Sequence, residues 1–235
     1  MALLNGQREI LLTVTGFFIM LPALLLNALR PFVASGRNET WMAEIAAWTE
    51  ANFIWIILVA VLAALGRLAM LILLLEPGRP TVGEALAAGA RLLPMFVAMD
   101  ILIGLMLLGG SLFFVVPAFY IFGRTFLAEP GFVATRARGP IAGLRAGFEG
   151  SRGNGWRIFL MAAIIYVAGV ILTAAVGSIV GVLGALAGGG GLDRFLTAFV
   201  DAVFGSGVSL LLVLVGVAAW RQLVQQRDVW SGVAR

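Results

Sequence analysis

The chain has 235 residues, of which 61% are apolar and only 12% are charged, and its formal net charge is +4. Soluble domains have about 25% charged residues, so this chain has too few polar side chains to cover a globule in water. It contains no Cys, no His and no Lys, and all 16 basic residues are arginine. These absences exclude disulfides, cysteine nucleophiles, imidazole metal ligands and Schiff-base lysines. We expect no cofactor.

Apolar runs longer than about 18 residues indicate transmembrane helices. We therefore predict an all-α integral membrane protein, folded as one six-span domain over residues 1–235. Pro22 should kink the first span. A cleaved signal peptide is the alternative for the first span. However, the apolar part of this span is longer than the apolar region of a signal peptide, which has about 7–15 residues. The spans are predicted at about residues 10–34, 53–75, 94–108, 112–135, 156–186 and 192–222.

Amphipathic segments connect these spans. Trp41, Ile45 and Trp48 recur at helical spacing, which indicates a short helix lying in the outer membrane interface. Residues 81–93 and 140–152 are predicted to form connector helices at the inner interface. The alternative for the first is that the third span extends backwards into it.

Glycines mark a turn and two packing sites. Gly109-Gly110-Ser111 is predicted to form a tight turn between the third and fourth spans. Gly143 and Gly147 have the four-residue spacing that permits close helix packing, and Gly177 and Gly181 repeat that spacing in the fifth span.

A parallel internal repeat is also indicated. Pro80-x-x-Gly83 and Pro140-x-x-Gly143 each follow a Glu-Pro-Gly sequence, and each precedes an apolar span. Both connectors lie on the same predicted side, as they do in parallel repeats. The general preference for Pro and Gly at helix ends is the alternative explanation.

The distribution of arginines predicts the orientation of the chain. Six spans place both termini on one side, and thirteen of the 16 arginines lie on that side; the exceptions are Arg30, Arg37 and Arg194. By the positive-inside rule that side is cytoplasmic. We expect a multi-pass protein of the bacterial inner membrane.

Charged residues inside the predicted spans form the candidate binding site, because intramembrane charges usually face a bundle interior or a wet cavity. They are Arg67, Asp100, Arg124 and Glu129. We expect Arg67, Asp100 and Arg124 to meet above Glu129, in a pocket open to the cytoplasmic leaflet. There the guanidinium groups would bind an anionic headgroup. The alternative is an ion-pair network that only holds the helices together.

Further arginines lie in and around the second connector and are predicted to contact the phospholipid headgroups of the inner interface. This interfacial basic connector comprises Arg136, Arg138, Arg145, Arg152 and Arg157. Because topology explains these charges, they do not indicate nucleic-acid binding.

Catalytic and metal-binding patterns are lacking in the sequence. No spacing brings two carboxylates together for acid–base chemistry, no cluster of acids indicates a metal site, and the glycine-rich segments lack the P-loop lysine. We expect no enzymatic activity.

The middle of the chain resembles a known family. The residues that carry the resemblance are Pro117-Ala118, Arg124, Ala128-Glu129-Pro130, Gly139-Pro140, Ala146, Glu149-Gly150-Ser151-Arg152 and Gly155-Trp156-Arg157. They are similar to the membrane-domain family of glycerophosphoryl diester phosphodiesterases and to the related YciC-like bacterial proteins. The resemblance covers about residues 75–170 and implies a six-helix bacterial membrane bundle. The phosphodiesterase activity does not carry over, since its catalytic domain uses His.

Two functional hypotheses follow from the sequence. The first is a lipid- or amphiphile-handling module with a regulatory or assembly role, which would involve a membrane-protein partner or a second copy of the chain. The second is a small secondary transporter or export-related permease. The charges lie toward the cytoplasmic leaflet instead of at mid-membrane, which favours the first.

Overall fold

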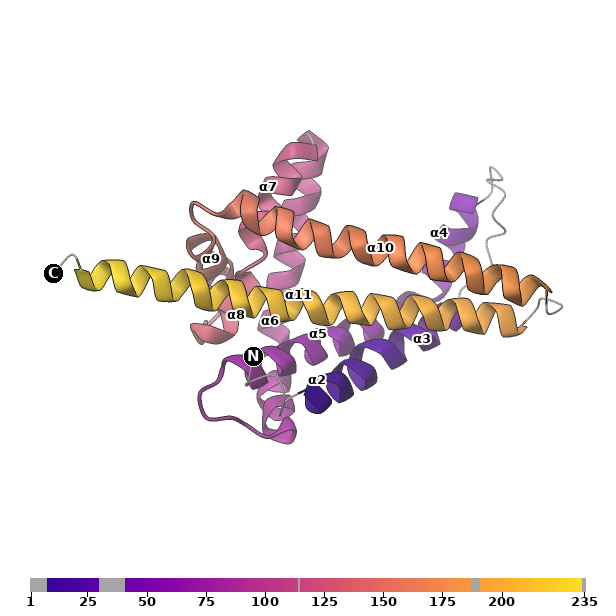
Figure 1. The fold of residues 1–235 in the computed structure, drawn as a ribbon, viewed down its shortest axis with the longest axis horizontal. Helices are drawn as coiled ribbons and strands as arrows, with labels where there is room; N and C mark the ends of the chain where they lie inside the picture. Colours follow the sequence, from indigo (N-terminus) through magenta and orange to yellow (C-terminus); the bar gives the residue numbers. More distant parts are fainter. Residues whose placement is uncertain (1–7, 30–40, 114, 187–190, 234–235) are drawn as a thin grey trace. The chain divides into compact units, whose positions relative to one another are not determined.

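The computed structural model describes residues 8–29, 41–113, 115–186 and 191–233, which contain helices and turns but no strand (Figure 1). Helices α2, η1 and α3 belong to the N-terminal segment, and α11 ends the described chain. The elements are α2 (Arg8–Thr15), η1 (Gly16–Met20), α3 (Leu21–Ala28), α4 (Trp41–Ala51), α5 (Phe53–Leu75), α6 (Val82–Phe113), α7 (Val115–Thr125), α8 (Ala128–Ala134), α9 (Pro140–Gly150), α10 (Gly155–Leu186) and α11 (Gly191–Val233).

Five helical segments of the described chain are long and apolar enough to cross a membrane, and they make this a multi-pass membrane protein. They are Arg8–Ala28, Phe53–Leu75, Val82–Leu112, Gly155–Gly184 and Arg194–Leu223. Four of these agree in position with the predicted first, second, fifth and sixth spans. The number of spans, predicted as six, is not confirmed.

The disturbance predicted at Pro22 takes the form of a π-helical turn. Segment η1 separates α2 from α3, and the N–H of Leu21 donates to the carbonyl of Gly16, five residues back. Proline has no N–H and its ring displaces the carbonyl four residues earlier, so a regular α-helical bond cannot form at Pro22. A π turn accommodates the lost bond.

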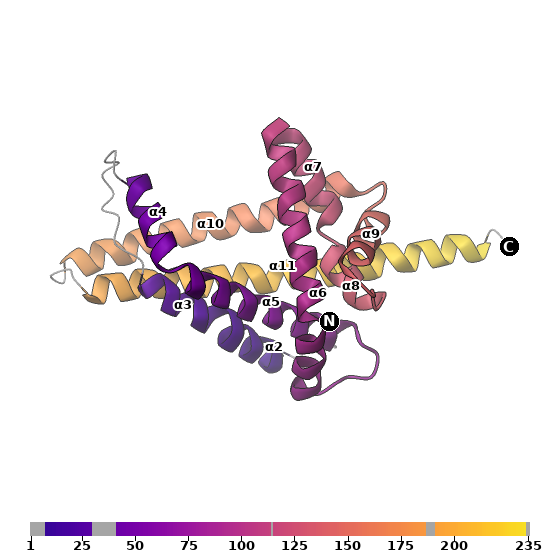
Figure 2. The same cartoon turned by 180° about the vertical axis from the view of Figure 1, so that it is seen from behind.

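Helix α6 shows where the third span begins and corrects the turn expected after it. It runs without interruption from Val82 to Phe113, so the predicted third span 94–108 extends backwards through residues 82–93 of the predicted connector. The tight turn expected at Gly109-Gly110-Ser111 is also helical. The reason is packing: a Cβ on Gly110 would lie 3.2 Å from the Cα of Ala118 in α7. Gly110 therefore allows α7 to lie against α6, and Figure 2 shows the two helices side by side.

The predicted fourth span 112–135 is not one helix. Phe113 ends α6, α7 ends at Thr125, and α8 begins at Ala128. Pro130 explains the second break, because its ring excludes a regular helical position for the carbonyl of Phe126. The predicted internal repeat is not confirmed either, since the first connector is part of α6 while the second is the separate helix α9.

The chain forms two compact units, residues 1–63 with 168–207 and residues 64–167 with 208–235, called here the terminal unit and the central unit. In the terminal unit, the helix predicted around Trp41, Ile45 and Trp48 is observed as α4, and the indole N–H of Trp48 donates to the carbonyl of Leu29 at 3.1 Å. In the central unit, an apolar core joins α8, α9, α10 and α11. Its buried members are Leu127, Ala146, Ile158, Ala219 and Trp220.

Candidate functional site

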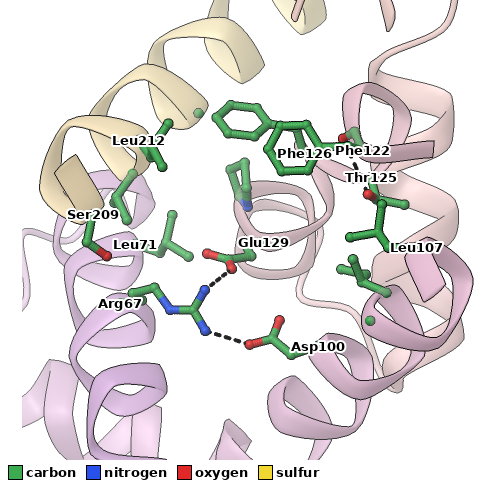
Figure 3. Close-up of a pocket in the computed structure, with 15 residues that line it drawn as sticks. Arg67, Leu71, Asp100, Leu107, Phe122, Thr125, Phe126, Glu129, Ser209 and Leu212 are labelled. Atoms are coloured by element: carbon green, nitrogen blue, oxygen red, sulfur yellow. Dashed lines mark hydrogen bonds and ion pairs between the residues drawn. The ribbon is translucent and has the colours of Figure 1, made fainter. Parts of the chain in front are cut away.

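Arg67 is the centre of a charged cluster in the central unit. Its Nη2 lies 2.6 Å from Asp100 Oδ2, and its Nη1 lies 2.5 Å from Glu129 Oε1. The side chains of Arg67, Asp100 and Glu129 are only 28%, 25% and 22% exposed. One guanidinium therefore bridges two carboxylates from different helices (Figure 3). We call these three residues the charged triad.

Three helices position the triad. Arg67 comes from α5, Asp100 from the middle of α6, and Glu129 from the first turn of α8. The Phe96 ring, one turn before Asp100, lies beneath the guanidinium with 5.8 Å between its centroid and Arg67 Cζ. Of the predicted cluster of Arg67, Asp100 and Arg124, the structure brings Arg67 and Asp100 together, and Glu129, which was expected to lie below the cluster, pairs with the same guanidinium.

Arg124 is not a member of the cluster, contrary to the expectation. Its Cζ lies 5.3 Å from the centroid of the Phe148 ring in α9. Its Cδ lies 3.0 Å from where a Cβ on Gly155 would be. The break between α7 and α8 separates Arg124 from Glu129. Of these two residues, Glu129 faces Arg67 and Arg124 does not.

A cavity of about 410 Å³ adjoins the triad within the central unit. Figure 3 shows the triad at one end, with Phe122, Phe126 and Leu212 at the other. The walls are otherwise mostly aliphatic, glycine or small polar residues from α5, α6, α7, α8 and α11. The lining residues are Arg67, Leu71, Asp100, Ile103, Gly104, Leu107, Phe122, Thr125, Phe126, Glu129, Pro130, Ser209, Leu212, Val213 and Gly216. A cavity with one charged end and apolar walls suits an amphiphile.

A tight joint between α7, α8 and α9 holds Glu129 in place. A Cβ on Gly147 would lie 2.7 Å from the backbone N and Cα of Ala128, so α9 packs directly on the first residue of α8. Fully buried Ser151 lies 2.9 Å from the carbonyl of Arg124 and 2.8 Å from that of Gly147. Its hydroxyl supplies a donor at the end of α7, where carbonyl groups lose their helical partners. The close-packing role predicted for Gly143 and Gly147 is confirmed.

The interfacial basic connector is exposed throughout. Arg136 reaches Glu76 Oε1 at 3.9 Å, and Arg145 Nε lies 2.8 Å from Glu149 Oε1 on α9. The hydrogen bond to Glu149 raises the pKa of Arg145. All five arginines, 136, 138, 145, 152 and 157, remain available to solvent or to headgroups.

Metal binding has no support in the described ranges, which hold no group of three acidic, His or Cys residues arranged around a common point. Sequence reasoning missed the aromatic pair Phe122 and Phe126 and the contribution of α11. Phe122 and Phe126 are four residues apart, a spacing that marks one helix face. No sequence signal indicates which face of α11 lines the cavity.

The comparisons with known proteins give no relative. No family model, no curated protein and no solved structure matches this chain.

Proposed function

We propose that this chain is a non-enzymatic protein of the bacterial inner membrane that binds a lipid or another amphiphile in the cavity beside the charged triad. The cavity carries this proposal: polar groups lie at one end of a space that is otherwise apolar. In a membrane protein, partly buried charges of this kind usually mark a ligand or ion site. The bound amphiphile would serve a regulatory or assembly role.

The exposed arginines around α9 support an inner-interface position for this end of the central unit. Arg145 and Arg152 are exposed on or beside α9, and Ile141 on the same helix is 74% exposed. Guanidinium groups beside an exposed apolar side chain suit a helix that lies among anionic headgroups. The phospholipid bilayer is thus the first partner that we propose.

For the topology, we propose six crossings, with α7 and α8 together forming the fourth. The chain has no native cysteine, so single cysteines at Asn38, Gly190 and Arg138 report topology without background. With both termini cytoplasmic, an impermeant maleimide added to intact cells should label positions 38 and 190 but not 138. Labelling at 138 alone would contradict the proposed orientation.

A secondary transporter is the second candidate function, and one observation favours it. Transporter sites are often built where a transmembrane helix is discontinuous. Here two residues separate the end of α7 from the start of α8, beside Glu129. Uptake of a solute or ion into proteoliposomes would establish this alternative.

Native mass spectrometry of the purified full chain tests the binding proposal. Gly104 lines the cavity, and a Cβ on it would meet none of the described residues within 4 Å, so Gly104→Leu should fill the cavity without disturbing α6. We expect wild type to retain a lipid or other amphiphile and Gly104→Leu to lose it. Gly177→Leu is the matched control, because Gly177 also has free space but does not line the cavity. Equal retention in the two variants would refute the proposal.

A further inference from the structure

The charged end of the cavity has an excess of negative charge. Arg67 contributes one positive charge, while Asp100 and Glu129 contribute two negative charges when ionised. These three are the charged residues among those that line the cavity in the described chain. An uncompensated charge is unfavourable in a partly buried membrane site, so the site gains stability from a cation that balances it.

Each carboxylate also keeps one oxygen unused. Asp100 binds Arg67 through Oδ2 and Glu129 binds it through Oε1. Within the described central unit, Asp100 Oδ1 and Glu129 Oε2 make no hydrogen bond. Both carboxylates are partly buried, with side chains 25% and 22% exposed. An unpartnered oxygen in such a place gains from a hydrogen-bond donor, so these two oxygens favour a ligand that donates hydrogen bonds.

The single positive charge of Arg67, by contrast, is already shared between two carboxylates. Its two terminal nitrogens each bind a carboxylate, and its face lies on Phe96. Arg124, the second guanidinium expected at the site, lies over Phe148. An anionic headgroup would therefore meet two carboxylates and one guanidinium that is already paired.

The rest of the cavity favours a cation that carries a hydrocarbon group. Phe122, Phe126 and Leu212 lie at the end away from Arg67 and Asp100, and Leu71 and Leu107 line the walls (Figure 3). A small hydrated cation gains nothing from these walls, whereas a hydrocarbon chain does.

We propose that the cavity binds amphiphiles that carry an ammonium group, either a free hydrophobic amine or the amine of a lipid headgroup. The ammonium donates to Asp100 and Glu129, and the hydrocarbon extends toward Phe122 and Phe126. This inference rests on the proposed binding function and names its ligand class.

Three probes of equal length test the ligand class: octylammonium, octanoate and 1-octanol. Their binding to the full chain in a neutral maltoside detergent is measured by equilibrium dialysis against a micelle blank. We expect octylammonium to bind at least about ten-fold more tightly than octanoate, a ratio that one lost charge interaction supplies. Glu129→Gln and Asp100→Asn should each weaken octylammonium by about ten-fold and leave 1-octanol unchanged.

Glu149→Gln is the matched control, since it makes the same chemical change at a carboxylate on the exposed side of α9. It should leave all three probes unchanged. Tighter binding of octanoate than of octylammonium, or octylammonium binding that Glu129→Gln does not weaken, would overturn the ammonium assignment. Should either triad variant fail to fold, the comparison of the three probes on wild type decides alone.

Gly104→Leu separates this inference from the function on which it rests. If it abolishes binding of all three probes while the charge variants change none, the cavity binds amphiphiles but the ammonium assignment is wrong. If wild type binds no probe and retains no lipid, both proposals are wrong. Retention of phosphatidylethanolamine over phosphatidylglycerol in native mass spectra identifies a lipid headgroup as the amine. Octylammonium binding without retained lipid identifies a free amine.

Discussion

Two glycine pairs in this chain have the same spacing but different surroundings. In the central unit, a Cβ on Gly143 would lie 2.7 Å from Phe132, and one on Gly147 would lie 2.7 Å from the backbone of Ala128. In the terminal unit, a Cβ on Gly177 or Gly181 would have nothing within 4 Å among the residues that the structure describes. Only the first pair packs as the sequence predicted for both. The spacing permits a close approach, but the facing element decides whether one occurs.

The central unit also buries polar groups with specific partners, namely the charged triad and Ser151. Close helix packing and polar pairing meet at α8. Gly147 of α9 packs on Ala128 at the start of this helix, and Arg67 pairs with Glu129 in its first turn. Substitutions in the central unit should therefore cost far more stability than the same substitutions in the second half of α10.

The largest effect is expected for Arg67→Ala. Removing the guanidinium leaves Asp100 and Glu129 uncompensated, and loss of one partner of a buried ion pair costs about 3–5 kcal/mol. Thermal or denaturant unfolding in detergent would measure the loss. Adding Asp100→Asn and Glu129→Gln should restore most of it, because no unpaired charge remains. Arg124→Ala is the control and should cost only about 0.5–2 kcal/mol, the value of a cation–π contact between partly buried side chains. Equal losses for Arg67→Ala and Arg124→Ala would contradict the observed pairing.

Gly147→Ala should have the next largest effect. The new methyl would collide with the backbone of Ala128, which cannot rotate away as a side chain can. Overpacking of this kind costs about 1–3 kcal/mol. Gly177→Ala makes the same change in open space and should stabilise α10 slightly, since alanine is the better helix former. Relative to wild type, the unfolding midpoint should fall for Gly147→Ala and rise for Gly177→Ala, both measured in one detergent. Midpoints that move in the same direction would contradict the difference in packing between the two glycine pairs.

The smallest of these effects is expected for Ser151→Ala. The hydroxyl is fully buried and lies within hydrogen-bond distance of the carbonyls of Arg124 and Gly147. Its removal should cost about 1 kcal/mol, the net value of a typical hydrogen bond. Ser178→Ala is the matched control, because among the described residues the Ser178 hydroxyl bonds within its own helix, to the carbonyl of Ala174. A loss no larger for Ser151→Ala than for Ser178→Ala would show that the joint does not need this hydroxyl.

The sequence predicts the long apolar helices well, because their length and composition leave few alternatives. It also predicts that Arg67 and Asp100 meet, since charges in spans seek partners. It fails at Gly109 and Gly110, where the glycines permit α7 to pack on α6 and do not form a turn. It fails at Arg124 because the break before Pro130 turns Arg124 and Glu129 toward different neighbours. Both failures depend on tertiary contacts that local patterns do not contain.

The central claim is that the cavity beside the charged triad holds an amphiphile. A crystal structure of the full chain grown from a lipidic mesophase tests it most directly. We predict elongated density that begins within hydrogen-bond distance of Asp100 and Glu129 and runs along Gly104 toward Phe122 and Phe126. Density confined to the outer surface, with the cavity closed by its own side chains, would contradict the account.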